Sequence, residues 1–148
     1  MKRSAAPVLH VAEPPPAYAW RPPIVVDCSV LSAALFQEET RDDALQLLLG
    51  KALHAPTLLD DEMVSVATKK AKAGWPEAVI TRALADYFEQ ALDLHRPDGE
   101  AQYALALRYQ LSAYDAAYLW LASELRAPLA TFDARLAAAA RTHLATLD

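Results

Sequence analysis

Short apolar runs alternate along the chain with longer stretches whose apolar residues recur at helical spacing. The apolar runs predict four buried strands, at residues 24–26, 54–59, 91–95 and 129–132, and a candidate fifth at 143–147. The stretches between them predict helices over residues 29–36, 40–49, 60–73, 76–90, 98–109, 112–125 and 134–141. Strands separated by helices pair in parallel through right-handed crossovers. The pattern therefore predicts an α/β domain with a four- or five-stranded parallel sheet flanked by helices.

Polar residues and glycines mark several of the expected helix ends. Asp60, Asp98 and Ser112 each stand at the start of a helical stretch, where a side-chain oxygen accepts from free backbone N–H groups. Gly50 and Gly74 stand at the end of two stretches, where a left-handed residue is favoured. These residues predict three N-caps and two helix stops.

The first 23 residues do not fit the alternation. They hold six of the chain's ten prolines, which exclude regular helix and central strand. We therefore divide the chain into a Pro-rich arm, residues 1–23, and a domain, residues 24–148. We expect residues 1–13 to be disordered and residues 17–23 to lie along the domain, anchored by Trp20. Deletion of residues 1–16 is expected to leave the fold intact.

Composition places the chain among single-domain proteins that do not span a membrane. Its 148 residues are 54% hydrophobic, which is enough for one domain with a core. No apolar run approaches the roughly 20 residues that cross a bilayer. The single cysteine, Cys28, cannot form an internal disulfide, which fits a reducing cytoplasm. We interpret Cys28 as a small buried residue and not as a nucleophile.

The charge of the domain is unfavourable for general nucleic-acid binding. The chain has a net charge of −5, and without residues 1–23, which carry three bases and one acid, the remainder has −7. Affinity for phosphate comes largely from Lys and Arg. This counts weakly against a nuclease, because a metal ion in an acidic site reverses the local charge.

Four acids stand where a parallel sheet would bring them together. Asp27 and Asp133 directly follow predicted strands, Glu62 lies just beyond another, and Asp115 lies near the start of a helix. Sites in open α/β sheets form outside the carboxyl ends of the strands. Carboxylates held close together repel each other, and a divalent cation removes that conflict. Their hard oxygen ligands suit Mg²⁺ or Mn²⁺.

Each acid also has a purely structural explanation. Asp27 and Asp133 could cap the helices that follow them, and Glu62 could be a first-turn acid that interacts with the helix dipole. Asp115 could form a capping box with Ser112. A structural role explains each position separately, whereas one shared site explains all four, so we favour the shared site.

The order and spacing of these residues resemble the PIN domain, and most closely the VapC-type toxins of bacterial toxin–antitoxin pairs. The resemblance runs from about residue 24 to the C-terminus. It rests on Val25-Val26-Asp27-Cys28-Ser29-Val30, Ala55-Pro56 followed by Glu62, Leu111-Ser112-Ala113-Tyr114-Asp115-Ala116-Ala117-Tyr118, and Pro128-Leu129-Ala130-Thr131-Phe132-Asp133. The segment around Asp115 is the most diagnostic of these.

The resemblance implies a Mg²⁺- or Mn²⁺-dependent endoribonuclease whose four site acids match Asp27, Glu62, Asp115 and Asp133. It implies RNA cleavage that leaves a 5′-phosphate and a 3′-hydroxyl. It also implies a protein antitoxin as partner and a homodimer. The chain departs from the family at Ser65, where Asn is frequent, and by placing Ala134 before the basic residue that follows Asp133.

Further residues surround the predicted site. Ser29, Ser65 and Thr131 are candidates for holding the metal ligands in place. The candidate RNA contacts are Lys69, Lys70, Lys72 and Arg135.

Three other functions are compatible with an acid that follows the first predicted strand. Haloacid-dehalogenase-type phosphatases need a second Asp where Ser29 stands, and response-regulator receivers need a late Lys, whereas none follows Lys72. A catalytically inactive PIN-like module that binds RNA or protein stays open as the alternative.

Overall fold

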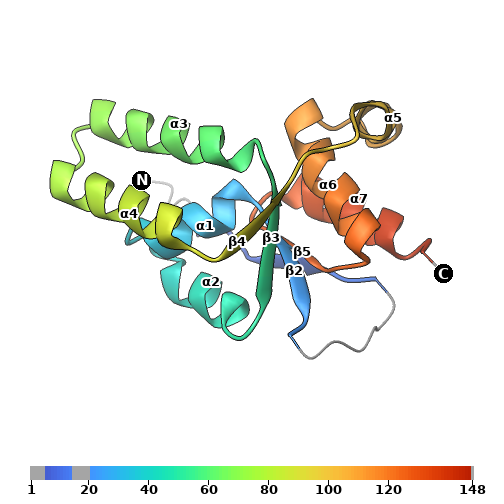
Figure 1. Cartoon of the computed structure of the whole chain (residues 1–148), viewed down its shortest axis with the longest axis horizontal. Coiled ribbons are helices and arrows are strands. Elements are labelled where there is room, and N and C mark those ends of the chain that lie inside the picture. The colour runs from blue at the N-terminus through green and yellow to red at the C-terminus, as the bar shows by residue number, and fades with distance from the viewer. Residues whose placement is uncertain (1–5, 15–20, 148) are drawn as a thin grey trace.

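The structure is a computed structural model that describes residues 6–14 and 21–147 (Figure 1). Its sheet has five strands in the order β1-β5-β2-β3-β4. Strands β2, β3, β4 and β5 are parallel, and β1 is antiparallel to β5. The strands are β1 (His10–Ala12), β2 (Pro23–Val26), β3 (Ala52–Pro56), β4 (Leu92–His95) and β5 (Leu129–Thr131). The α/β prediction is confirmed, and the expected all-parallel pairing is corrected at one edge.

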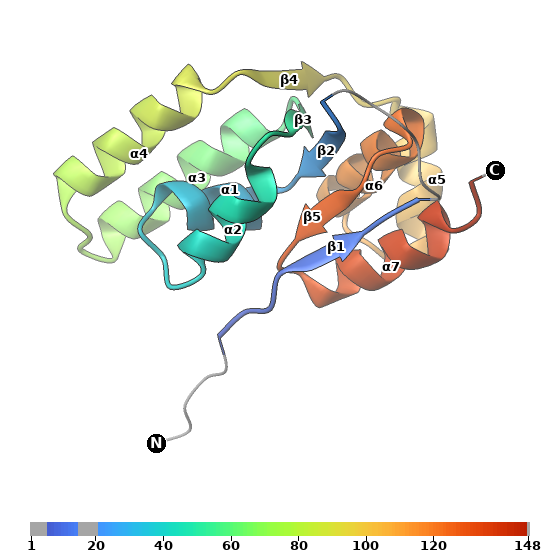
Figure 2. The same ribbon diagram turned by 90° about the horizontal axis from the view of Figure 1, so that it is seen from below.

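Helices cover both faces of this sheet. The group α1 to α4 lies on one side and the group α5 to α7 on the other, as Figures 1 and 2 show. The helices of the described residues are α1 (Cys28–Leu35), α2 (Arg41–Leu48), α3 (Leu59–Lys72), α4 (Glu77–Glu89), α5 (Gly99–Tyr109), α6 (Ala113–Leu125) and α7 (Ala134–Leu144). None of them is long and apolar enough to pass through a membrane.

The two central strands explain why the apolar runs are continuous. Ile24, Val25 and Val26 of β2 are buried, and so are all three residues of β5. A parallel strand covered by helices on both faces has no solvent side, so polar residues do not alternate along it. The edge strand β4 is different, because Asp93 and Leu94 are exposed.

The N-terminal segment supplies the fifth strand. Val11 pairs with Ala130 of β5, and Ala12 is buried. The expectation that residues 1–13 are disordered is therefore wrong for residues 10–12. Those residues lie between Pro7 and Pro14, and an edge strand tolerates nearby prolines because only one of its sides pairs. Trp20, the expected anchor, lies outside the described residues.

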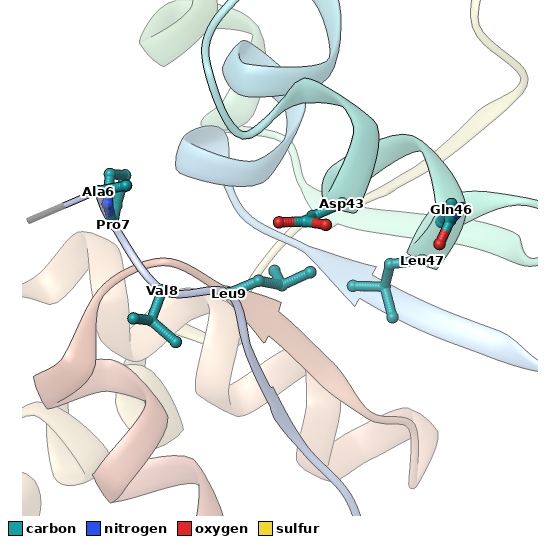
Figure 3. Close-up of a pocket in the computed structure, with 7 residues that line it drawn as sticks. All are labelled: Ala6, Pro7, Val8, Leu9, Asp43, Gln46 and Leu47. Carbon is teal, nitrogen blue, oxygen red and sulfur yellow. The ribbon is translucent and has the colours of Figure 1, made fainter.

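The residues just before β1 face α2 across a shallow hollow (Figure 3). Leu9 packs against the hydrophobic core, while Val8 is exposed. The hollow is lined by Ala6, Pro7, Val8, Leu9, Asp43, Gln46 and Leu47. None of the four predicted site acids lines it.

The predicted strand at residues 143–147 is wrong, because α7 continues to Leu144. Leu136, Ala140 and Leu144 are all buried, and their spacing of four residues places them on one helix face. This face packs against the sheet, so the end of the chain completes a helix. The fifth strand comes instead from the opposite end of the chain.

The predicted helix ends are mostly confirmed. The side chains of Asp98 and Ser112 cap α5 and α6, and Gly50 and Gly74 have φ values of 74° and 84°. The predicted cap at Asp60 is wrong, because α3 begins one residue earlier, at Leu59. Asp60 lies inside the first turn, where its carboxylate has a different partner, described below.

Candidate active site

The four predicted acids lie at the carboxyl ends of the parallel strands. Asp27 directly follows β2, and Asp133 lies two residues beyond β5. Glu62 is near the beginning of α3, the helix that follows β3, and Asp115 is in the first turn of α6. Because β2, β3 and β5 run in the same direction, these positions all lie at the carboxyl ends of the strands, and we call this side of the sheet the acidic edge.

Asp27 is the most buried of the four acids, with 6% of its surface exposed. Its Oδ1 accepts hydrogen bonds from the Ser29 hydroxyl at 2.6 Å and from the Val30 amide at 3.1 Å. Its Oδ2 accepts from the Thr131 hydroxyl at 2.5 Å. Asp27 is therefore also the N-cap of α1. The structural and functional interpretations of this residue do not exclude each other.

The two hydroxyls that hold Asp27 also hold the turn that carries Asp133. The Ser29 hydroxyl accepts from the Phe132 amide at 3.0 Å, and the Thr131 hydroxyl accepts from the Asp133 amide at 2.9 Å. Asp133 caps α7 by accepting from the Leu136 amide at 2.9 Å. The ends of β2 and β5 are thus joined through side chains.

Glu62 has a partner that the sequence did not predict. The Tyr118 hydroxyl of α6 donates to Glu62 Oε1 at 2.6 Å. Tyr118 lies three residues after Asp115 on the buried side of α6 and is 1% exposed. A buried tyrosine hydroxyl requires a hydrogen-bond partner. This requirement could have indicated from the sequence that Tyr118 bonds to a polar residue.

Three of the acids have raised pKa values, and their causes show that the acids are neighbours. Burial raises the pKa of Asp27, its hydrogen bonds oppose this, and the charge of Asp115 adds to it. Burial raises the pKa of Glu62, Tyr118 opposes this, and the charges of Asp27 and Asp115 add to it. Burial and then the charge of Asp133 raise the pKa of Asp115. A cation would favour the ionised form of all three.

The donor set fits a hard divalent cation in its chemistry, because every candidate ligand is a carboxylate. The four carboxylates lie farther apart, however, than the ligands of a closed metal site. Within residues 6–14 and 21–147, no three His, Cys, Asp or Glu side chains form a group that could hold a metal ion.

Known proteins share this fold and this sequence pattern. The pattern of the PIN domain matches residues 24–142. The chain belongs to the PIN domain family. The VapC ribonuclease Mb0985 of Mycobacterium bovis is 36% identical over 114 residues, which cover 76% of this chain and 87% of that protein. Ribonuclease VapC1 of Mycobacterium tuberculosis is 32% identical over 118 residues, covering 78% of this chain and 89% of that one.

A solved structure supports the fold alone. PAE2754 from Pyrobaculum aerophilum superposes with a TM-score of 0.65 at 24% identity, and the match covers 83% of this chain and 87% of that one. The PIN domain match begins at residue 24, so strand β1 lies outside it.

The basic residues of this PIN domain fall into two groups. Lys69, Lys72 and Arg135 are exposed. Arg135 donates to the Gln110 carbonyl at 2.8 Å and lies two residues after Asp133, and its charge opposes the rise in the pKa of Asp115. Of the predicted residues that surround the site, Ser65 is exposed on α3.

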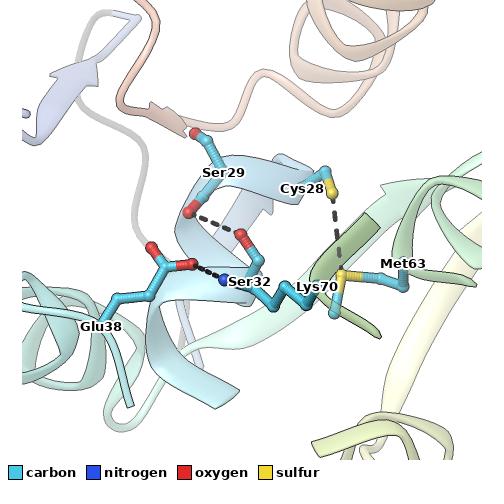
Figure 4. Close-up of polar contacts among 6 residues, drawn as sticks. All are labelled: Cys28, Ser29, Ser32, Glu38, Met63 and Lys70. Atoms are coloured by element: carbon cyan, nitrogen blue, oxygen red, sulfur yellow. Dashed lines mark hydrogen bonds and ion pairs between the residues drawn. The ribbon is translucent and has the colours of Figure 1, made fainter. Parts of the chain in front are cut away.

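Lys70 is committed to contacts within the protein. Its Nζ donates to Glu38 Oε1 at 3.0 Å (Figure 4). The same Nζ lies 3.8 Å from the centre of the Trp75 ring. Only 15% of its side chain is exposed. Burial of the stem and a cation–π contact are characteristic of a structural lysine.

Cys28 has the properties of an unreactive thiol. It donates to Met63 Sδ at 3.8 Å (Figure 4). Burial, together with the charges of Glu62 and Asp27, raises the pKa of Cys28 to about 12. The thiolate is the nucleophilic form, so a thiol with this pKa stays protonated at neutral pH.

Proposed function

We propose that this PIN domain is a Mg²⁺- or Mn²⁺-dependent endoribonuclease. The observation that carries the proposal is that Asp27, Glu62, Asp115 and Asp133 all stand at the carboxyl ends of parallel strands, and that three of the four have raised pKa values. The names of the VapC ribonucleases support the same activity. The expected products carry a 5′-phosphate and a 3′-hydroxyl.

The acids of the site have distinct tasks in this proposal. Asp27, Asp115 and Asp133 bind the ion, directly or through water, and Glu62 binds it or orients the attacking water. When bound, such an ion makes water acidic enough to supply hydroxide near neutral pH and stabilises the charge on the phosphate and leaving oxygen. Ser29, with Thr131, keeps the most buried of these carboxylates in a single orientation.

Exposed bases are expected to contact the RNA backbone. Arg135 lies beside Asp115, and its guanidinium can bind a phosphate with two parallel hydrogen bonds. Lys69 and Lys72 of α3 offer further positive charge in an otherwise acidic domain. We leave Lys70 out of this group because it is paired with Glu38.

A toxin–antitoxin role follows from the VapC relatives. We propose that the chain is the toxin of a type II pair and that the C-terminal segment of an antitoxin covers the acidic edge. An Arg or Lys of that segment would pair with the carboxylates in place of a metal ion. A homodimer is expected as well. Light scattering that finds only monomers at tens of micromolar would contradict the dimer.

One observation favours the alternative, a catalytically inactive PIN-like module that binds RNA or protein. In the described part of the chain, the acids do not form a group of three that could hold an ion. Under this alternative the carboxylates serve as helix caps and hydrogen-bond acceptors, as Asp27 and Asp133 do.

A cleavage assay separates the two functions. A 5′-labelled RNA is incubated with the full chain in Mg²⁺, in Mn²⁺ and in excess EDTA. We expect metal-dependent cleavage that is lost in Asp115→Asn and Glu62→Gln. The matched control is Asp61→Asn, since Asp61 is an exposed acid in the same turn of α3 as Glu62. Cleavage by the control but not by the two site variants supports the nuclease. RNA binding without any cleavage supports the inactive module.

A further inference from the structure

One hydrogen bond joins the start of α3 to α6 across the acidic edge of the sheet. Its donor is the Tyr118 hydroxyl, and its acceptor is Oε1 of Glu62, 2.6 Å away. Tyr118 is 1% exposed, so its ring is fixed by the core, whereas Glu62 is half-buried at the surface. Hydrogen bonds to carboxylates are the shorter and stronger kind. A rigid donor therefore holds a flexible acid.

The position of Tyr118 on its helix connects it to a second acid. Asp115 lies three residues earlier on α6, and residues three apart lie on the same side of a helix. The charge of Asp115 also adds to the raised pKa of Glu62. One face of α6 thus presents one acid of the site and holds another.

We propose that Tyr118 is a positioning residue that fixes the Glu62 carboxylate relative to Asp115 and so assembles half of the metal site. The inference rests on the proposed metal-dependent function. Tyr118 itself touches neither ion nor RNA in this proposal and acts only through Glu62. Partners of metal ligands typically contribute 10- to 100-fold to metal affinity or activity.

The competing explanation is that Tyr118 merely ties two helices together. The chain provides a matched comparison for it. The Tyr87 hydroxyl of α4 donates to Asp60 Oδ1 at 2.7 Å, two residues before Glu62 on α3. Tyr87 is also nearly buried, at 3% exposed. Both bonds tie α3 to a neighbouring helix through a tyrosine and an acid, but only one of the two acids belongs to the site.

The test measures Mn²⁺ binding directly, by the loss of the electron paramagnetic resonance signal of free Mn²⁺. The full chain is compared with Tyr118→Phe, Tyr87→Phe and Glu62→Gln. We expect Tyr118→Phe to weaken Mn²⁺ binding by about 10-fold, and Tyr87→Phe to leave it unchanged. The double variant Tyr118→Phe/Glu62→Gln should bind no more weakly than Glu62→Gln alone, because Tyr118 acts through Glu62. The KM for RNA should not change in Tyr118→Phe.

The outcomes separate this inference from the function on which it rests. Wild-type Mn²⁺ affinity in Tyr118→Phe, together with a loss in Glu62→Gln, overturns the positioning role and leaves the metal site standing. A wild-type chain that neither binds Mn²⁺ nor cleaves RNA overturns both. If Tyr118→Phe does not fold, Tyr118→Met replaces it, because methionine also lacks the hydroxyl and its flexible apolar side chain adapts to the core. Weaker Mn²⁺ binding by Tyr118→Met then supports the role, and unchanged binding overturns it.

Discussion

The network around Asp27 allows its charge and its hydrogen bonds to be measured separately. Asp27→Asn and Asp27→Ala both remove the buried carboxylate, so any relief from burying a charge is common to the two variants. They differ in what remains. Asn keeps an oxygen that can accept from Ser29 and Val30, whereas Ala loses every side-chain bond. The difference in stability between them therefore reports the hydrogen bonds and the packing of the side chain without the contribution of the charge.

The size of that difference follows from the bonds that are lost. Losing an N-cap costs about 1 kcal/mol. A buried hydroxyl left without its acceptor, as that of Thr131 would be, costs about 1–3 kcal/mol. In Asp27→Asn the side-chain NH2 group takes the place of the oxygen that accepts from Thr131, so this variant recovers only part of the lost stability. We therefore expect Asp27→Ala to be less stable than Asp27→Asn by about 2 kcal/mol.

Urea unfolding at pH 7 in EDTA measures the difference, provided that the m-values of the two variants agree. Equal stabilities would refute the reasoning, because they would mean that the network around Asp27 does not stabilise the fold. RNA cleavage should be lost in both variants. A cleavage-competent Asp27→Asn would remove Asp27 from the proposed catalytic acids.

Three further predictions concern the pH dependence of stability, strand β1 and Lys70. Burial raises the folded-state pKa of Asp27, Glu62 and Asp115 above the unfolded value, so the metal-free fold binds more protons than the unfolded chain. Its stability should rise as the pH falls from 7 through the folded pKa values toward about 4, and thermal melts that show a fall instead would contradict this. Because β1 covers the edge of β5, the expectation from the sequence that the arm can be deleted without effect on the fold is revised. Deleting residues 1–14 should destabilise the fold by about 2 kcal/mol and cause association beyond the oligomeric state of the full chain; a variant with the size and stability of the full chain in light scattering and urea unfolding would contradict this. Lys70→Ala should lower the free energy of unfolding by about 1–2 kcal/mol through the lost cation–π contact, and an unchanged urea midpoint would refute it.

Local chemistry explains which parts of the fold could be predicted from the sequence. The apolar runs identified β2 and β5 because those strands are buried on both faces, and Asp98 and Ser112 identified the starts of α5 and α6. Strand β1 was missed because its three residues form a strand only when β5 is beside them. The end of α7 was misjudged because residues 143–147 fit either pattern until Leu144 is seen packing in the core.

The positions of the four acids in the fold could be predicted, but the side chains around them could not. Sequence order placed all four acids at strand or helix ends, and those positions depend mostly on local structure. The bond from Tyr118 to Glu62 joins residues on different helices, so it depends on how α3 and α6 pack. Lys70 was predicted as an RNA contact because it lies near Lys69 and Lys72 in the sequence. Its contact with Trp75 could not be predicted, because it depends on the conformation of the turn between α3 and α4.

The strand order has a consequence for the order of events during synthesis. Strands β1 and β2 come from the first 26 residues, yet both pair with β5, which is made of Leu129–Thr131 near the other end of the chain. The sheet therefore cannot close until β5 has left the ribosome. Asp27 likewise gains its bond from Thr131 only at that stage. A nascent chain whose β5 is still inside the ribosome therefore lacks the finished acidic edge.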